Sequence, residues 1–151
     1  MANSISVNVK GVYILSTISG PTPVVLLADD KERIVPIYIG FPEAISINAA
    51  LKNEVSPRPM THDLIMSILN TLRARIIKIV IDDLDEQIYY ARLYVRNGDE
   101  EVNIDARPSD CIALAIRASA PIFIEEDVID KVAITKREIE GARPIDTFLN
   151  Y

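Results

Sequence analysis

The chain has 151 residues, of which 49% are hydrophobic and 25% are charged, a composition typical of a soluble globular domain with its own apolar core. No apolar run reaches the roughly 18–20 residues of a membrane span, and the N-terminus lacks the apolar stretch of a signal peptide. We therefore expect a cytoplasmic protein without membrane contact. The net charge of −6 disfavours broad electrostatic binding to nucleic acid unless a local basic patch or a bound cation offsets it.

The first half of the chain predicts three strands followed by two helices. Stretches rich in Val, Ile and Leu, separated by Gly, Pro and Asp, are typical of strands. Pro42 suits the first turn of a helix, where its missing N–H removes no hydrogen bond. Thr61 is expected to cap the second helix, whose apolar residues recur at helical spacing. The predicted strands cover residues 6–16, 23–30 and 33–40, and the predicted helices cover residues 42–52 and 62–73.

The second half of the chain predicts three more strands and a third helix, followed by a short strand. Asn97-Gly98 is a strong signal for a tight hairpin turn. Ser109 is expected to cap the helix that follows this hairpin. The predicted strands cover residues 75–84, 87–97, 100–105 and 120–126, and the predicted helix covers residues 109–119.

The two halves resemble each other around their first prolines. "IYIGFPEAISINAAL" (37–51) and "NIDARPSDCIALAIR" (103–117) align with Pro42 on Pro108, although proline is common at helix starts. We expect a single α+β domain over residues 1–126, built from two β-β-β-α units with a helix between them. Its sheet is expected to be mostly antiparallel or mixed, with helices packed against it. The tail, residues 127–151, is expected to hold one helix and then become irregular.

The third predicted helix is apolar on nearly every side, from Cys111 to Ile116. Such a helix needs cover on more than one face, from a sheet on one side and from another helix or subunit on the other. A homo-oligomer is therefore expected, and a twofold dimer is the commonest kind. Cys111 is the only cysteine, which fits a reducing compartment, and it is expected to be a buried structural thiol.

Two helix starts share a formula. "RPMTHD" (58–63) and "RPSD" (107–110) each contain Arg-Pro, then a hydroxyl residue, then Asp. On a structural interpretation the hydroxyl residues cap the helices, and the aspartates lie in the first turn, where the helix dipole favours negative charge. Capping motifs are far more common than catalytic sites, so this interpretation is favoured as the complete explanation of these residues.

The same helix starts also suit a binding site for anions, because helix N-termini attract negative charge and Arg offers a planar fork to phosphate. Alternation along "VNIDA" turns Asp105 away from the core face just before the turn. If the two helix starts meet in space, carboxylates could hold a divalent cation, arginines a phosphate, and His62 could act as base or ligand. The residues of such a cleft would be Arg58, His62, Asp63, Asp105, Arg107 and Asp110.

A further pattern lies on the predicted strand 87–97. Tyr and Arg alternate onto one face, from Tyr90 to Arg96, where they could stack bases and contact phosphates. Tyr and Arg are equally typical of an exposed sheet face or a subunit interface, and the acidic chain favours this second interpretation.

The motifs "VPIYIGFPEAISI" (35–47), "RPMTHDLI" (58–65) and "IDARPSDCIALAIR" (104–117), in that order, resemble the bifunctional nuclease (BFN) domain family. The resemblance spans most of residues 10–126; the family usually has Ala where this chain has Cys111. It implies an α+β domain that forms homo-oligomers and a nuclease activity on RNA and DNA. The motif residues carried over are Glu43, Arg58, Thr61, His62, Asp63, Asp105, Arg107, Ser109 and Asp110.

The leading hypothesis is a metal-assisted nuclease. Asp105 and Asp110, with Glu43 or Asp63, are expected to hold Mg²⁺ or Mn²⁺. Catalysis is expected to use Asp105, Asp110, His62 and Asp63, and phosphate binding is expected to use Arg58, Arg107, Thr61 and Ser109. The alternative is a non-enzymatic oligomeric module that binds a small anion, nucleotide or protein partner at the two helix starts. In a third possibility the motifs serve oligomer assembly alone.

Overall fold

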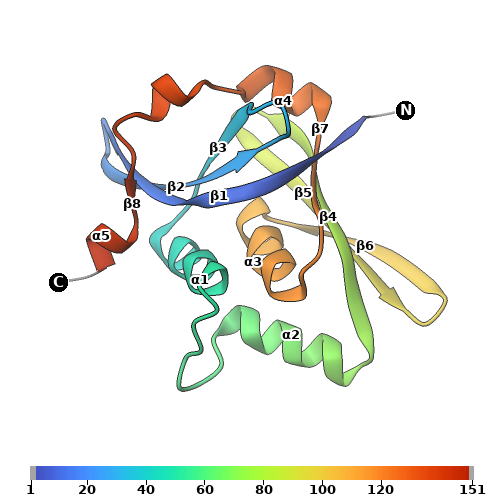
Figure 1. The fold of residues 1–151 in the computed structure, drawn as a ribbon. Helices are drawn as coiled ribbons and strands as arrows, with labels where there is room; N and C mark the ends of the chain where they lie inside the picture. The colour runs from blue at the N-terminus through green and yellow to red at the C-terminus, as the bar shows by residue number, and fades with distance from the viewer. Residues whose placement is uncertain (1–2, 150–151) are drawn as a thin grey trace.

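A computed structural model describes residues 3–149 and forms one α+β domain (Figure 1). Each predicted strand and helix is present, with its ends shifted by a few residues. The strands are β1 (Ser4–Thr17), β2 (Gly20–Ala28), β3 (Ile34–Tyr38), β4 (Ala74–Asp85), β5 (Ile88–Asn97), β6 (Glu100–Ala106), β7 (Ile122–Glu125) and β8 (Arg143–Pro144). The helices are α1 (Phe41–Leu51), α2 (Thr61–Thr71), α3 (Pro108–Ala118), α4 (Glu126–Val132), α5 (Asp146–Leu149) and a 3₁₀ turn at Lys136–Ile139.

The sheet consists of two antiparallel three-stranded meanders joined by a short central strand. Its order is β3-β2-β1-β7-β4-β5-β6, with β8 added beside β1. The central strand β7 runs antiparallel to β1 and parallel to β4, which makes the sheet mixed. The element order therefore confirms two β-β-β-α units with a helix, α2, between them.

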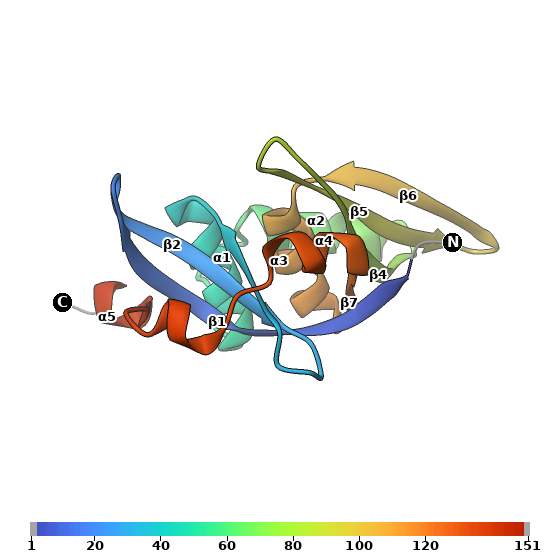
Figure 2. The same ribbon diagram turned by 90° about the horizontal axis from the view of Figure 1, so that it is seen from above.

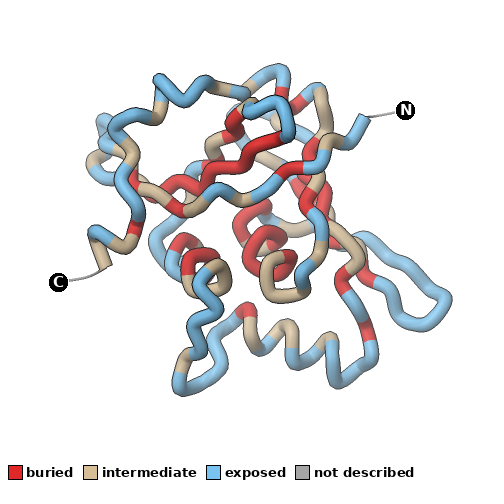
Figure 3. The backbone as a smooth tube through the Cα atoms, in the orientation of Figure 1, coloured by how far each residue is buried: buried red, intermediate tan, exposed pale blue. Residues whose placement is uncertain are grey.

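The sheet curls around α3. Figures 1 and 2 show α3 between the two meanders, and the hydroxyl of Tyr89 on β5 donates a hydrogen bond to the carbonyl of Pro36 on β3 at 3.3 Å. On its other sides α3 packs against α1 and α2. Figure 3 shows the resulting core as a buried centre around α3 and the inner strands, with exposed loops outside.

The enclosure of α3 removes one reason to expect an oligomer. Residues Cys111–Ala115 of α3 are all buried by the sheet and the helices of the same chain. No partner subunit is needed to cover this helix, so its apolar surface does not support an oligomer. The Cys111 side chain is fully buried, and this burial raises the pKa of its thiol to about 12, which fits an unreactive structural thiol.

The C-terminal tail packs against the rest of the domain. Val128 and Ile129 of α4, together with Ile145, are buried in the main hydrophobic core. The strand β8 pairs with β1. Within residues 3–149, none of the helices combines the length and apolar character required to cross a membrane.

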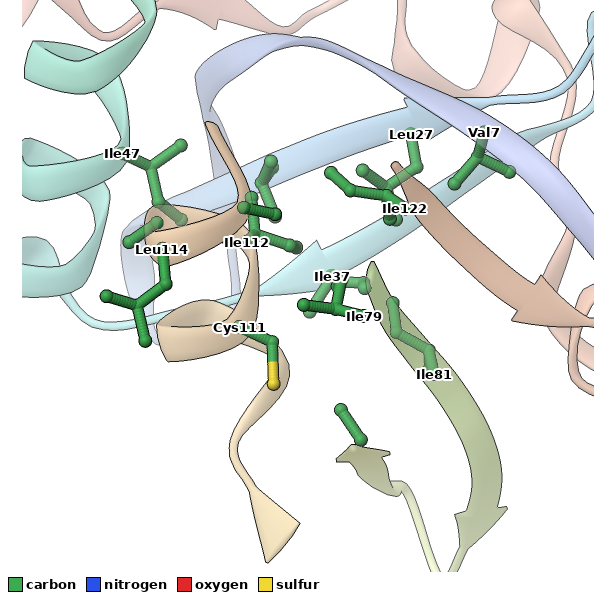
Figure 4. Packing of buried hydrophobic residues seen from close by; sticks show 14 of the residues in the cluster. Val7, Leu27, Ile37, Ile47, Ile79, Ile81, Cys111, Ile112, Leu114 and Ile122 are labelled. Atoms are coloured by element: carbon green, nitrogen blue, oxygen red, sulfur yellow. The ribbon is translucent and has the colours of Figure 1, made fainter. Parts of the chain in front are cut away.

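Ile112 tests the packing at the centre of the fold. Its side chain is fully buried among the inner strands and α1 (Figure 4). Ile112→Ala is expected to lower the free energy of unfolding by about 2–5 kcal/mol, because it leaves a cavity that a rigid core fills poorly. Urea denaturation measures this loss.

Ile18→Ala is the matched control. Ile18 lies fully exposed in the turn between β1 and β2, so the same truncation should change stability by less than about 0.5 kcal/mol. Equal losses in the two variants would contradict the packing described for α3.

Candidate functional site

The two Arg-Pro helix starts meet in space. They line one cavity of about 340 Å³, together with the first turn of α1. The N-terminal ends of α1, α2 and α3, each the positive end of its helix dipole, therefore converge on the same space. We call it the His62 cavity, and its lining residues are Pro42, Glu43, Ser46, Met60, Thr61, His62, Ile65, Arg107 and Asp110.

The predicted helix caps are wrong. Helices α2 and α3 begin at Thr61 and Pro108, so the capping positions fall on Met60 and Arg107. Thr61 and Ser109 lie inside the first turns, and neither makes a capping hydrogen bond. The start of α2 is instead closed by Asp63, whose carboxylate accepts the backbone N–H of Met60 at 3.0 Å.

His62 joins two helices to its own. Its side chain is 9% exposed, with Nδ1 2.6 Å from the hydroxyl of Ser46 on α1 and Nε2 2.9 Å from Oδ1 of Asp110 on α3. A buried imidazole with a partner on each nitrogen is held in one orientation. His62 is the single buried residue of α2, so this contact is also where α2 is anchored most deeply.

Arg117 contributes a further donor to this group of hydrogen bonds. Its Nη2 donates to the hydroxyl of Ser46 at 3.2 Å and to the Ser46 carbonyl at 3.3 Å, and a guanidinium has no acceptor atom. Ser46 therefore accepts from Arg117, but a hydroxyl has a second lone pair, so this contact alone does not set the direction of the bond to His62. The Asp110 carboxylate sets it, because it only accepts: Nε2 of His62 donates to Asp110, and Nδ1 of the neutral imidazole accepts the Ser46 proton.

The carboxylates at the two ends of this hydrogen-bond network, Asp110 and Asp63, are ionised and each is paired with an arginine. Burial alone raises the pKa of Asp110, but hydrogen bonds from Arg107 and His62 outweigh it and hold the pKa below its ordinary value. Asp110 accepts from Nε of Arg107 at 2.9 Å, and Nη2 of Arg107 lies 3.5 Å from Glu43. The Met60 N–H and then Arg117, at 3.0 Å, lower the pKa of Asp63.

The structure brings together only part of the predicted site. Glu43, Thr61, His62, Arg107 and Asp110 line the His62 cavity. Three other predicted residues lie outside this cavity. Asp63 faces Arg117, Ser109 lines a neighbouring cavity, and Arg58 is exposed on the loop before α2.

Asp105 lies on the opposite side of the sheet from the helices. Its neighbour Ile104 pairs in register with Leu93, which faces the core, whereas Asp105 pairs with Arg92 on the outer face. The predicted alternation was therefore correct, but the cavity is on the helical side. Across residues 3–149, no three His, Cys, Asp or Glu side chains are grouped to hold a metal ion.

Tyr90, Arg92, Tyr94 and Arg96 of β5 also lie on the outer face, whereas Tyr89 faces the core. Arg96 pairs with Glu101 at 2.8 Å, and Nε of Arg92 lies 3.6 Å from Asp82. The ammonium of Lys78 lies 4.7 Å from the centre of the Tyr94 ring. Carboxylates thus offset two of the cations on this face.

Sequence reasoning missed Ser46 and Arg117 as parts of the site. Each stands as a polar residue in an apolar helical stretch: Ser46 lies between Ile45 and Ile47, and Arg117 follows the apolar run that ends at Ile116. A buried polar residue in such a stretch needs a hydrogen-bond partner, and this was the available signal.

Fold and site together define an α+β domain with a polar cavity at three converging helix starts. The family model described as "Bifunctional nuclease domain" matches residues 24–137. The chain therefore belongs to the bifunctional nuclease domain family.

Relatives span bacteria and plants. "Uncharacterized protein MT1877" of Mycobacterium tuberculosis is 37% identical over 113 residues, which cover 74% of this chain and 67% of that protein. "Bifunctional nuclease 1" of Oryza sativa subsp. japonica is 27% identical over 108 residues, 70% of this chain and 33% of that protein. "Bifunctional nuclease 1" of Arabidopsis thaliana is 24% identical over 122 residues, 79% of this chain and 38% of that protein.

The lowered pKa values of Asp63 and Asp110 predict an acid-sensitive fold. A carboxyl whose pKa is lower in the folded than in the unfolded state stabilises the fold above its unfolded pKa. The stabilisation is lost as pH falls through the folded pKa, so stability should drop below about pH 4. Asp63→Asn should lower stability at neutral pH and flatten this drop, as measured by denaturation across pH.

Asp99→Asn is the control, because Asp99 is exposed in the hairpin turn after β5. It should leave both the neutral stability and the acid drop unchanged. Parallel curves for the wild type and Asp63→Asn would show that the ion pair of Asp63 with Arg117 has no role in acid stability.

His62 is the only histidine, so its ring nitrogens give unambiguous ¹⁵N NMR signals. At mildly alkaline pH we expect the Nε2–H form to dominate, because the Asp110 carboxylate accepts the Nε2 proton. Asp110→Ala removes this acceptor and should shift the nitrogen signals towards a mixture of the two neutral forms. A wild-type ring protonated mainly on Nδ1 would refute the assigned hydrogen-bond direction.

Proposed function

We propose that this domain hydrolyses phosphodiester bonds of RNA or DNA in the His62 cavity. The observation that carries the proposal is the contact between His62 and Asp110, 2.9 Å apart, in the same cavity as Arg107. A histidine supported by a carboxylate is a common general base, and an arginine is a common phosphate ligand. The family and the names of the plant relatives are consistent with this reaction.

Arg107 is the group proposed to bind the phosphate. Its side chain is 65% exposed at the mouth of the cavity. Its Nε and Nη2 contact Asp110 and Glu43, whereas Nη1 has no hydrogen bond or ion pair to any residue in the described part of the chain. Two N–H groups of Arg107 are thus open to a phosphate oxygen, beside three positive helix ends.

The proposed base is His62, acting through Ser46. A water in the cavity donates a proton to the Ser46 hydroxyl as its oxygen attacks phosphorus, and Ser46 passes its own proton to Nδ1 of His62. The phosphorus–oxygen bond to the leaving group breaks in the same displacement, and the leaving oxygen departs as an alkoxide that takes a proton from solvent. Asp110, hydrogen-bonded to Nε2, stabilises the imidazolium that forms.

No step of this mechanism passes through a metal ion. The expected ligand set does not fit as it stands, because Asp105 faces away while Asp110 and Glu43 both contact Arg107. A requirement for Mg²⁺ or Mn²⁺ stays a prediction from the sequence, and an assay with and without a chelator tests it.

The alternative is a module that binds a nucleotide or small anion without cleaving it. One observation favours it: both nitrogens of His62 are already hydrogen-bonded, and the neighbouring carboxylates are neutralised by arginines. Such a closed network resembles a rigid binding surface more than a base that is ready to act. A ligand that raises the melting temperature without turnover would support this alternative.

The expected homo-oligomer has a candidate surface on α2. Four apolar residues at every fourth position of the helix and its cap are exposed: Met60, Leu64, Ile68 and Leu72. The sequence from Leu64 to Leu72 has no charged residue, and interface cores are similarly depleted of charge. We propose that a second copy of the chain packs on this stripe.

Metal-dependent and metal-free cleavage of single-stranded RNA and DNA tests the nuclease proposal. His62→Gln should lower the cleavage rate by about 10²–10⁴-fold, the usual contribution of a general base. Asp99→Asn, purified in parallel, should keep the wild-type rate. Cleavage that survives His62→Gln unchanged, with the fold verified by circular dichroism, would point to a contaminant or another site.

Light scattering after size exclusion tests the α2 stripe. Ile68→Glu should convert a dimer to a monomer, because it buries a charge in the proposed interface. Ile88→Glu, at an isoleucine on β5 that is 58% exposed against 48% for Ile68, should leave the dimer intact. A wild-type monomer at high concentration, or a dimer in both variants, would refute this surface.

A further inference from the structure

A second cavity adjoins the His62 cavity and shares two of its lining residues. It also has a volume of about 340 Å³, within the roughly 300–1,000 Å³ of typical small-molecule sites. Glu43 and Arg107 line both cavities, so their ion pair stands between them. We call it the Tyr38 cavity; its other lining residues are Ile37, Tyr38, Ile39, Gly40, Gln87, Ile88, Tyr89, Pro108 and Ser109.

The Tyr38 cavity differs from the His62 cavity in chemistry. Arg107 and Glu43 are its only charged side chains, and the rest of its wall is mostly apolar or aromatic. Tyr38, 53% exposed, and Ile88, 58% exposed, are large apolar side chains open to solvent. The flat ring of a nucleobase stacks on such surfaces, and aromatic stacking tolerates any base.

The cavity is held open by the curl of the sheet. It lies where the end of β3 approaches the start of β5, and the hydroxyl of Tyr89 bridges these strands through Pro36. Gln87, in the turn before β5, contributes an amide with both donor and acceptor groups, which can hydrogen-bond the edge of a base.

We propose that the Tyr38 cavity is a nucleobase subsite. A phosphate bound at Arg107 would have the His62 cavity on one side and the Tyr38 cavity on the other. The base attached to that phosphate would then stack on Tyr38, beside Ile88 and Gln87. The inference rests on the proposed function in that Arg107 binds the phosphate, and it adds the place where the base of the substrate is bound.

Binding of two phosphorylated probes tests this subsite without any turnover. Adenosine 5′-monophosphate and ribose 5-phosphate carry the same sugar phosphate, but only the first has a base. In calorimetry the wild type should bind the nucleotide about 10-fold more tightly, as expected for one stacked base. Tyr38→Ala should abolish this preference without weakening ribose 5-phosphate, and Tyr38→Phe should retain the preference.

Two further variants complete the experiment. Arg107→Ala should weaken both probes, because it removes the shared phosphate ligand. Tyr90→Ala is the matched control: Tyr90 is 42% exposed on the outer face of β5 and should leave both affinities unchanged.

Several outcomes would overturn the subsite. These are equal binding of the two probes to the wild type, an unchanged preference in Tyr38→Ala, or no binding of either probe at millimolar concentration. Failure of the nuclease proposal gives a different result. A Tyr38-dependent preference for the nucleotide in a protein that cleaves neither RNA nor DNA would retain the subsite and assign it to a binding module.

Discussion

The helical side of this domain depends on the hydrogen bonds of Arg117. Its guanidinium, 13% exposed, contacts Asp63 on α2, Ser46 on α1 and the carbonyl of Ala113 on its own helix. A buried charge is stable only when its hydrogen-bonding groups find partners, so the three helices must keep one relative position to satisfy it. That position also places Ser46 against His62.

The site is an extension of this packing interaction. From Arg117 the contacts continue through Ser46 and His62 to Asp110 and Arg107, so the interior of the helical layer is connected to the mouth of the cavity. Because an ionised carboxylate can only accept, Asp110 determines the proton position on His62, and Ser46 then donates to Nδ1. The contacts that hold the helices together are therefore the same ones that orient His62 for acid-base chemistry.

The curled sheet explains why two cavities lie side by side. Each β-β-β-α unit delivers a helix start at the end of its third strand, α1 after β3 and α3 after β6. The curl brings those two helix starts together and leaves Glu43 facing Arg107. The likeness between the two proline turns in the sequence therefore corresponds to two neighbouring walls of one site.

The sequence by itself determined the elements, their order and the polar residue types at the helix starts, because periodicity, proline and hairpin signals are local. It also indicated that His62, Arg107 and Asp110 would be neighbours if the two Arg-Pro helix starts met, and they line one cavity. Only the tertiary structure decided which of the remaining candidates belong. Asp105 lies outside the site because the cavity is on the helical side of the sheet. Ser46 and Arg117 belong to the site, but their partners are distant in the chain, so local patterns did not indicate them. Burial and hydrogen bonding between helices are long-range properties, and spacing along the chain does not contain them.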